Sequence, residues 1–146
     1  MRRLFSETKI YPIPAEQPTL LAQARLLQKY QEKAEKFTKM SAFYQHKLRE
    51  NVEAYVAQYP QDMNGLILLA RVLSLGGNDL KAEEKLRQVL AQHPDNLWAH
   101  LALSSLYYQA EDLDGARRAL ENVLFYYPGH PTAQARLDML NKIREK

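Results

Sequence analysis

Four histidines are the residues of this sequence that could bind a metal ion or act as a general base. They are His46, His93, His100 and His130, and each lies in a different segment of the chain. None has the His-x-x-x-His or Glu-x-x-His spacing that would place two ligands on one face of a helix. His93 directly precedes Pro94, as Tyr59 precedes Pro60 and Tyr127 precedes Pro128, and this position favours a packing role for it. We therefore expect no metal site.

The other patterns that could carry catalysis are short or incomplete. Ser6-Glu7-Thr8-Lys9 has the Ser-x-x-Lys spacing of a serine nucleophile, but it lacks the companion motifs of such a site. The pair Gly76-Gly77 is not followed by the Lys and Ser or Thr of a phosphate-binding loop, so it indicates the end of a helix. Neighbouring carboxylates such as Asp112 and Asp114 fall at expected helix starts, where they offset the helix macrodipole. The chain has no cysteine, which excludes thiol catalysis and disulfides, and we expect neither enzyme activity nor a cofactor.

The composition indicates one folded domain. The chain has 146 residues, of which 46% are hydrophobic and 25% charged, and this is enough apolar material for a core. The net charge of +3 is too small to favour a nucleic-acid partner, and no apolar run reaches the roughly 18 residues of a membrane span. No signal-peptide pattern opens the chain, so with Met1 at its start the cytoplasm is the expected compartment. A bacterial periplasmic location would require an anchor or signal removed before Met1.

The N-terminal third divides at Pro18. Residues 1–17 have no helical periodicity, and Tyr11-Pro12-Ile13-Pro14 favours an extended arm because each proline keeps the preceding residue out of the helical region. Pro18 is suited to start a helix, and no Gly or Pro interrupts the helical pattern that follows. Residues 18–62 therefore predict either one long helix or two helices with a break near Thr38–Ser41. A single helix would be about 60 Å long, which exceeds the size of such a domain, so we favour the pair.

A repeat of 34 residues governs the rest of the chain. Pro60, Pro94 and Pro128 are separated by this interval. Apolar residues recur at the same interval before each proline: Val52, Leu86 and Leu120; Tyr55, Val89 and Val123; Val56, Leu90 and Leu124. The small residues Ala82 and Ala116 match in the last two copies. A period of this length, with helical spacing inside each copy, is the signature of a helical solenoid.

Two complete copies run over residues 63–96 and 97–130, and each holds two expected helices. Each copy is divided by a turn that ends in an aspartate, Asp79 or Asp112, and both aspartates are expected to cap the helix that follows. The leucines directly after these aspartates are 33 residues apart, so the turns are one residue out of register by this count.

These residues resemble the tetratricopeptide repeat family, whose units are 34-residue helical hairpins. The signature positions hold Leu69, Ala70, Leu73, Ala82, Leu86, Val89 and Pro94 in the first copy, and Leu103, Tyr107, Ala116, Leu120, Val123 and Pro128 in the second. The resemblance implies an all-α fold, a right-handed superhelical array of antiparallel helix hairpins with about seven helices. It gives an extended arm over 1–17, a helical pair over 18–62 whose second helix is repeat-like, two hairpins over 63–130 and a capping helix over 131–146.

In this family the first helix of each hairpin lines a concave groove, and the resemblance carries this role to twelve residues. They are Asn64, Ile67, Arg71, Ser74, Leu75, Trp98, Leu101, Ser105, Tyr108, Gln109, Ala135 and Met139. The implied surface is apolar and aromatic, with one cation at Arg71. The Lys and Asn with which some family members clamp a terminal carboxylate are absent, since Ile67 and Leu101 stand there. This favours an apolar or amphipathic peptide over an acidic tail, and the chain's own segment Ile10–Pro14 is the alternative occupant.

The sequence therefore predicts a non-catalytic protein–protein interaction module, a scaffold or adaptor for a partner protein or peptide. Two alternatives stay open. One is a dedicated chaperone that keeps an aggregation-prone or secreted client soluble. The other is a homo-oligomeric structural protein, with exposed Phe37, Met40, Phe43 or Tyr44 joining two copies through the N-terminal helices.

Overall fold

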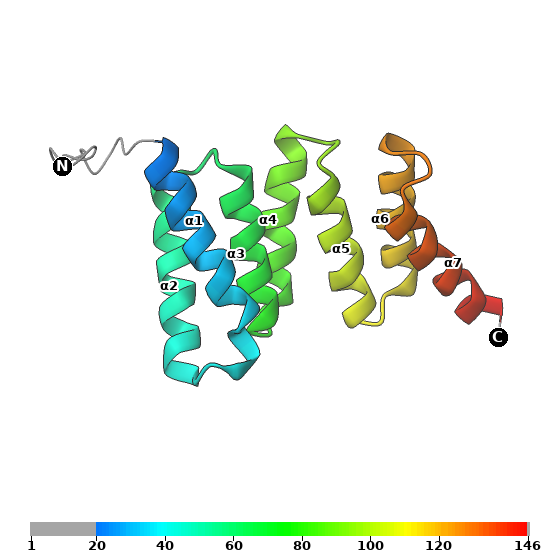
Figure 1. Ribbon diagram of the computed structural model, residues 1–146. Coiled ribbons are helices and arrows are strands. Elements are labelled where there is room, and N and C mark those ends of the chain that lie inside the picture. Colours follow the sequence, from blue (N-terminus) through cyan, green and yellow to red (C-terminus); the bar gives the residue numbers. More distant parts are fainter. Residues whose placement is uncertain (1–19, 146) are drawn as a thin grey trace, which may run out of the picture.

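The computed structural model describes residues 20–145, and within this range every regular element is a helix (Figure 1). The elements are α1 (Leu20–Glu35), the short 3-10 helix η1 (Phe37–Lys39), α2 (Ala42–Gln58), α3 (Met63–Leu75), α4 (Asp79–Gln92), α5 (Leu97–Gln109), α6 (Leu113–Tyr126) and α7 (Pro131–Glu145). The prediction of an all-α fold with about seven helices is confirmed. None of the helices in the described range is both long and apolar enough to span a bilayer. The expected arm over 1–17, with Ser6–Lys9 and Ile10–Pro14, lies outside the described residues.

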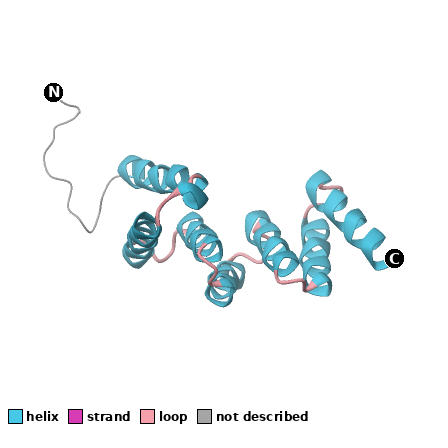
Figure 2. Ribbon diagram, turned by 90° about the horizontal axis from the view of Figure 1, so that it is seen from below, coloured by secondary structure: helices cyan, strands magenta, loops and turns pink. Residues whose placement is uncertain are grey.

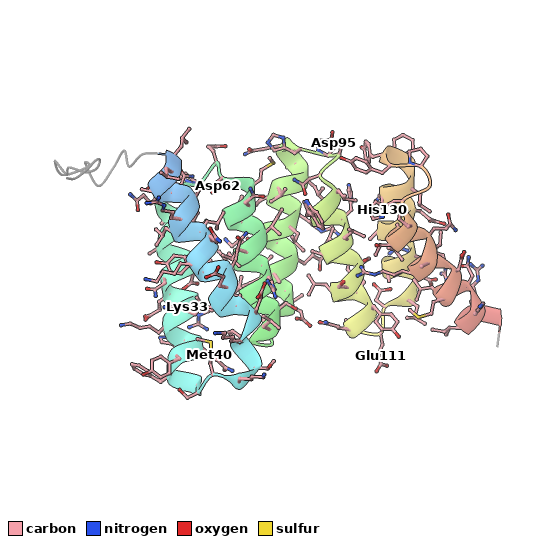
Figure 3. The ribbon with its side chains drawn as sticks, viewed as in Figure 1. Lys33, Met40, Asp62, Asp95, Glu111 and His130 are labelled. Carbon is pink, nitrogen blue, oxygen red and sulfur yellow. The ribbon has the colours of Figure 1, made fainter. Side chains whose placement is uncertain are left out.

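The helices stand side by side in chain order and form two layers. Figure 2 shows α1, α3, α5 and α7 along one side of the array and α2, α4 and α6 along the other. Helix α1 lies across α2 and α3, and each later helix packs against the next one in the chain. The connections lie at the two ends of the helices, with Met40 and Glu111 at one end and Asp62 and Asp95 at the other (Figure 3). This is the helical repeat array that the 34-residue period predicts.

The N-terminal helical segment is broken between α1 and α2, close to the expected Thr38–Ser41. The side-chain amide of Gln45 holds the reversal, because its Nε2 donates to the carbonyl oxygens of Phe37 at 2.9 Å and Met40 at 3.2 Å. Phe37 itself is only 4% exposed and packs beside Gly76 at the end of α3. The expectation that Phe37 is available to join two copies is therefore wrong.

Residues that repeat every 34 positions fall at equivalent places in the core. Val52, Leu86 and Leu120 are each 1% exposed or less, and the second set, Tyr55, Val89 and Val123, is buried as well. The matched small residues Ala82 and Ala116 are also fully buried, where a short side chain lets two helices approach closely. The 34-residue period of the sequence is thus also the period at which buried residues recur.

One carboxylate ties the ends of α1, α2 and α3 together. Asp62 caps α3, since its Oδ1 accepts a hydrogen bond from the backbone N–H of Asn64 at 3.0 Å. Its Oδ2 accepts from the Tyr55 hydroxyl at 2.5 Å and from Gln23 Nε2 at 3.3 Å. Burial, and then the bond to Asp62, raise the pKa of Tyr55 well above its usual range, so the phenol remains a donor. Gly65 leaves room for the ring, because a Cβ there would stand 2.7 Å from Tyr55 Cε1.

The turns inside the two hairpins are in register, which corrects the sequence interpretation. Helix α4 begins at Asp79 and its N-cap is Asn78, 34 positions before Asp112, the N-cap of α6. Asp79 is therefore not the cap, because the helix has already begun when the chain reaches it. The expected role of Asp112 is confirmed, since its Oδ1 accepts from the backbone N–H of Gly115 at 2.9 Å.

Each of these turns contains one residue with a positive φ angle. It is Gly77 (86°) in the first hairpin and Glu111 (62°) at the equivalent position of the second. The next N–H in each turn then donates back to the preceding helix, from Asn78 to the carbonyl of Leu73 and from Asp112 to that of Tyr107, both at 2.8 Å. Glycine adopts this backbone freely, whereas a residue with a Cβ pays about 1 kcal/mol for it.

His93 is exposed at the end of α4, so the expected packing role for it is wrong. The comparison with tyrosine fails for a local reason. Tyr59 is held by the Tyr55 ring, with centroids 4.9 Å apart, but the residue equivalent to Tyr55 in the next copy is the much smaller Val89. The pre-proline position thus packs only where an aromatic partner stands one turn earlier.

Glu111→Gly should raise the free energy of unfolding by up to about 1 kcal/mol, because it removes the left-handed strain that Gly77 avoids. Urea unfolding followed by circular dichroism measures the effect. Gly77→Ala is the matched control at the equivalent turn and should cost about 1 kcal/mol. A Glu111→Gly chain no more stable than the wild type would show that this turn carries no strain.

Candidate partner-binding groove

A hollow of about 430 Å³ lies between α3 and α5, with one residue from α7 at its side. It is lined by Ile67, Ala70, Arg71, Ser74, Leu75, Leu86, Trp98, Leu101, Ala102, Ser105, Leu106, Gln109 and Arg136. Helical spacing explains why these residues meet. Ile67, Arg71 and Ser74 follow one stripe of α3, and Trp98 and Ala102 begin the facing stripe of α5, while other stripes of both helices are buried in the core.

A second hollow of about 240 Å³ continues the first between α5, α6 and α7. It is lined by Ser104, Ser105, Tyr108, Gln109, Ala116, Leu120, Arg136, Met139 and Leu140. Ser105, Gln109 and Arg136 line both hollows, so the two hollows are adjacent. We call the two hollows together the groove.

Ten of the twelve residues expected from the family resemblance line the groove. Those in the first hollow are Ile67, Arg71, Ser74, Leu75, Trp98, Leu101, Ser105 and Gln109. Tyr108 and Met139 line the second hollow, whereas Asn64 and Ala135 line neither. Leu101 is only 8% exposed, so it forms part of the floor.

Large apolar side chains of the groove are open to solvent, and Trp98, Tyr108 and Met139 are the most exposed of them. Trp98 is 63% exposed, and Tyr108 and Met139 are each 45% exposed. Aromatic side chains with an accessible face are favoured anchors in protein interfaces, because they bury a large area at a small cost in side-chain entropy. The groove therefore presents exposed large side chains from two helices, Trp98 and Tyr108 on α5 and Met139 on α7.

Arg136 is the charged residue of the groove that sequence reasoning missed, and the expectation of a single cation at Arg71 is wrong. The expected residues on α7 were Ala135 and Met139, which lie on either side of it in the sequence. The signal was available, because Arg136 stands 34 positions after Ala102, which lines the same hollow. At this position of the repeat, α7 has the long side chain of Arg136 where α5 has only the methyl group of Ala102.

Two of the three serine hydroxyls of the groove are engaged by their own helix. Ser104 Oγ donates to the carbonyl of Leu101 at 2.7 Å, and Ser105 Oγ donates to the same carbonyl at 3.3 Å. Arg136 Nη1 in turn donates to Ser104 Oγ at 3.5 Å. In this arrangement the serines act as helix-bound polar groups at the wall of the groove.

His100 is the buried histidine of the described chain, and its bonds are structural. Its Nε2 donates to the carbonyl of Pro94 at 2.7 Å, and its ring stacks on Tyr126 with centroids 5.8 Å apart. In the described residues there is no group of three or more His, Cys, Asp or Glu side chains that could hold a metal ion.

A cluster of three polar side chains joins α5 to α4 beside the groove. The Tyr107 hydroxyl donates to Glu83 Oε2 at 2.6 Å and accepts from Arg87 Nη2 at 2.5 Å. Arg87 also donates to Glu83 Oε2 through Nε at 2.9 Å. The bond from Tyr107, and then the bond and charge of Arg87, lower the pKa of Glu83 although partial burial opposes this. The ionised form of Glu83 is therefore the form that holds α4 and α5 together.

The lowered pKa of Glu83 predicts a stabilisation that depends on pH. This stabilisation is present above about pH 4.3, which is the ordinary pKa of Glu, and it is lost as the pH falls through the lower pKa that Glu83 has in the folded chain. Tyr107→Phe removes the largest cause of the lowered pKa. The free energy of unfolding of this variant should therefore fall less than that of the wild type between about pH 5 and about pH 3. Urea unfolding across this range measures the difference. Equal pH dependence in the two chains would contradict the assignment.

The comparisons with known proteins agree with the helical array. Residues 80–138 match the family model of the tetratricopeptide repeat. The cellulose synthase operon protein C of Pseudomonas fluorescens (strain SBW25) is 33% identical over 85 residues, which cover 56% of this chain and 7% of that protein. Part of the chain is therefore similar to tetratricopeptide repeat proteins, and the chain spans a small fraction of that relative's length. Repeats of this class generally mediate protein–protein interaction.

Proposed function

We propose that the chain is an interaction module that binds a peptide or helical segment of a partner protein in the groove, and so acts as a scaffold or adaptor. The observation that carries this proposal is Trp98. It is the one tryptophan of the chain, and it stands 63% exposed over the first hollow. An exposed indole beside an apolar floor is typical of a binding anchor that is covered when the partner arrives.

The chemistry of the groove supports a polypeptide ligand over a small substrate. Apolar side chains make up most of its lining, and the hydroxyls of Ser104 and Ser105 are already bonded to the helix backbone. The groove also runs across several helices, from α3 to α7, so it presents a succession of side-chain pockets. A bound peptide or helix uses such pockets along its length.

A photo-reactive phenylalanine analogue tests this at two positions. Placed at Gln109, which lines both hollows, it should cross-link a partner polypeptide in a cell lysate. Placed at the exposed Gln88 on the outer side of α4, it should not. Trp98→Ala with Tyr108→Ala should lower the yield at position 109 at least about tenfold, because both lost side chains are anchors, while helix content stays unchanged.

Mass spectrometry of the adduct then identifies the partner. Equal yields from positions 88 and 109, or a yield at position 109 that survives the double substitution, would contradict binding in the groove. A client that stays soluble only with a stoichiometric amount of this chain would make the module a dedicated chaperone.

A homodimer through the N-terminal helices is a second candidate, and an exposed aromatic pair favours it. Phe43 and Tyr44, at the start of α2, are 67% and 59% exposed, and their rings meet edge-on with centroids 5.3 Å apart. Tyr44 shares a shallow hollow with Lys33, Lys36 and Lys47. Two copies that paired here about a two-fold axis would bring these like charges close together.

Such a dimer should strengthen as salt is raised, because salt screens the repulsion between the lysines. Sedimentation velocity at low and high salt measures the dimer, and Phe43→Ala with Tyr44→Ala should abolish it. Phe125→Ala, which removes a similarly exposed ring from α6, is the control and should leave the dimer intact. A monomer under all of these conditions would remove this candidate.

A further inference from the structure

We propose that the occupant of the groove is an acidic, amphipathic segment within a partner protein. In this arrangement an Asp or Glu side chain of the segment pairs with Arg71 and Arg136, while a neighbouring bulky apolar side chain packs on Trp98. The inference rests on the proposed function and specifies the chemistry of the partner.

The charged residues that line the groove are both cations. Arg71 comes from α3 and Arg136 from α7, and both line the first hollow. Among the described residues that line either hollow there is no Asp or Glu. The positive charges therefore stand over a mainly apolar surface, where attraction to a carboxylate is stronger than in open water.

Neither arginine forms an ion pair within the part of the chain that the structure describes. Their own helices offer no carboxylate at the positions that could reach them. Three and four places from Arg71 stand Ile67, Leu68, Ser74 and Leu75, and from Arg136 stand Thr132, Ala133, Met139 and Leu140. The polar contact of Arg136 is the 3.5 Å bond to the neutral Ser104 hydroxyl.

Two arginines elsewhere in the array, Arg87 and Arg117, show the contrast. Arg87 Nη2 lies 2.9 Å from Glu83 Oε2 on α4, and Arg117 Nη1 lies 2.7 Å from Asp114 Oδ1 on α6. These two arginines receive a partner from their own helix, three or four residues away. Arg136 is half-buried and has no such partner on its own helix. A guanidinium in such a place forms its strongest hydrogen bonds with a carboxylate, and here that carboxylate would come from another chain.

The shape of the groove favours a side-chain carboxylate over a chain terminus. Arg136 lies where the two hollows join, and the second hollow continues beyond it to Tyr108 and Met139. A ligand that ended at Arg136 would leave this second hollow empty. A segment that passes Arg136 in both directions fills both hollows and places an internal Asp or Glu between the arginines.

Selection from a displayed library of random peptides tests the proposal, with the full chain as the bait. The library is fused through its C-terminus, so no free terminal carboxylate is offered. Retained peptides should be enriched in Asp or Glu next to a bulky apolar residue. Selected peptides, made without tryptophan and with amidated ends, should change the fluorescence of Trp98, which is the one indole of the chain.

Arg71→Gln with Arg136→Gln should weaken these peptides at least about tenfold, the loss expected for charge-assisted hydrogen bonds. Arg118→Gln, which removes an exposed cation outside the groove, is the matched control and should change the affinity less than about twofold. Circular dichroism melting of each variant shows that the fold is retained.

The other outcomes would each overturn the proposal in a distinguishable way. Peptides that alter Trp98 fluorescence without acidic enrichment would leave the groove as a binding site but remove the carboxylate. Acidic enrichment confined to a second library with free C-termini would assign the arginines to a terminal carboxylate. Retention only after Ile10→Ala and Ile13→Ala in the full chain would give the groove to the segment Ile10–Pro14. If no retained peptide alters Trp98 fluorescence, the proposed function fails together with the inference.

Discussion

The stacking of equivalent residues at every thirty-fourth position is the constraint on which the rest of this structure depends. Val52, Leu86 and Leu120 are fully buried, and one helical hairpin alone would leave each of them uncovered on one side. Neighbouring hairpins must therefore stack, and stacking puts α3, α5 and α7 on one side of the array. The helix faces of α3, α5 and α7 that are not buried in the core form the groove, so the groove is a geometric consequence of the way the core packs.

The periodic part of the fold could be predicted from sequence because each copy repeats the same pattern of burial. Prediction failed where a local choice decides the structure. Asn78 and Asp79 are both good capping residues, so their types alone do not tell which one precedes the helix. Phe37 lies in a turn that occurs once in the chain, and no period could show that the turn folds its ring against α3.

The candidate site likewise has one part that the repeat pattern predicts and one part that it does not. The stripes on α3 and α5 follow from helical spacing and could be carried over from the repeat pattern, and they hold most of the groove. Arg136 could not be found by residue type, because its counterpart Ala102 gives no indication of a charge at that register position. The electrostatic character of the groove therefore comes from a departure from the repeat. The repeat determines the shape of the groove, and this departure adds a charge to it.

The carboxylate of Asp62 has a bearing on how the N-terminal end of the array opens. The cap of α3, the phenol of Tyr55 on α2 and the amide of Gln23 on α1 all share this one group. When the end of α1 or α2 moves away, this carboxylate loses one of its donors, and when Asp62 itself moves, all three bonds are lost together. Native-state opening at this end is therefore expected to involve the three helices as one cooperative foldon, in place of the gradual fraying of α1 that a terminal helix in a solenoid would otherwise show.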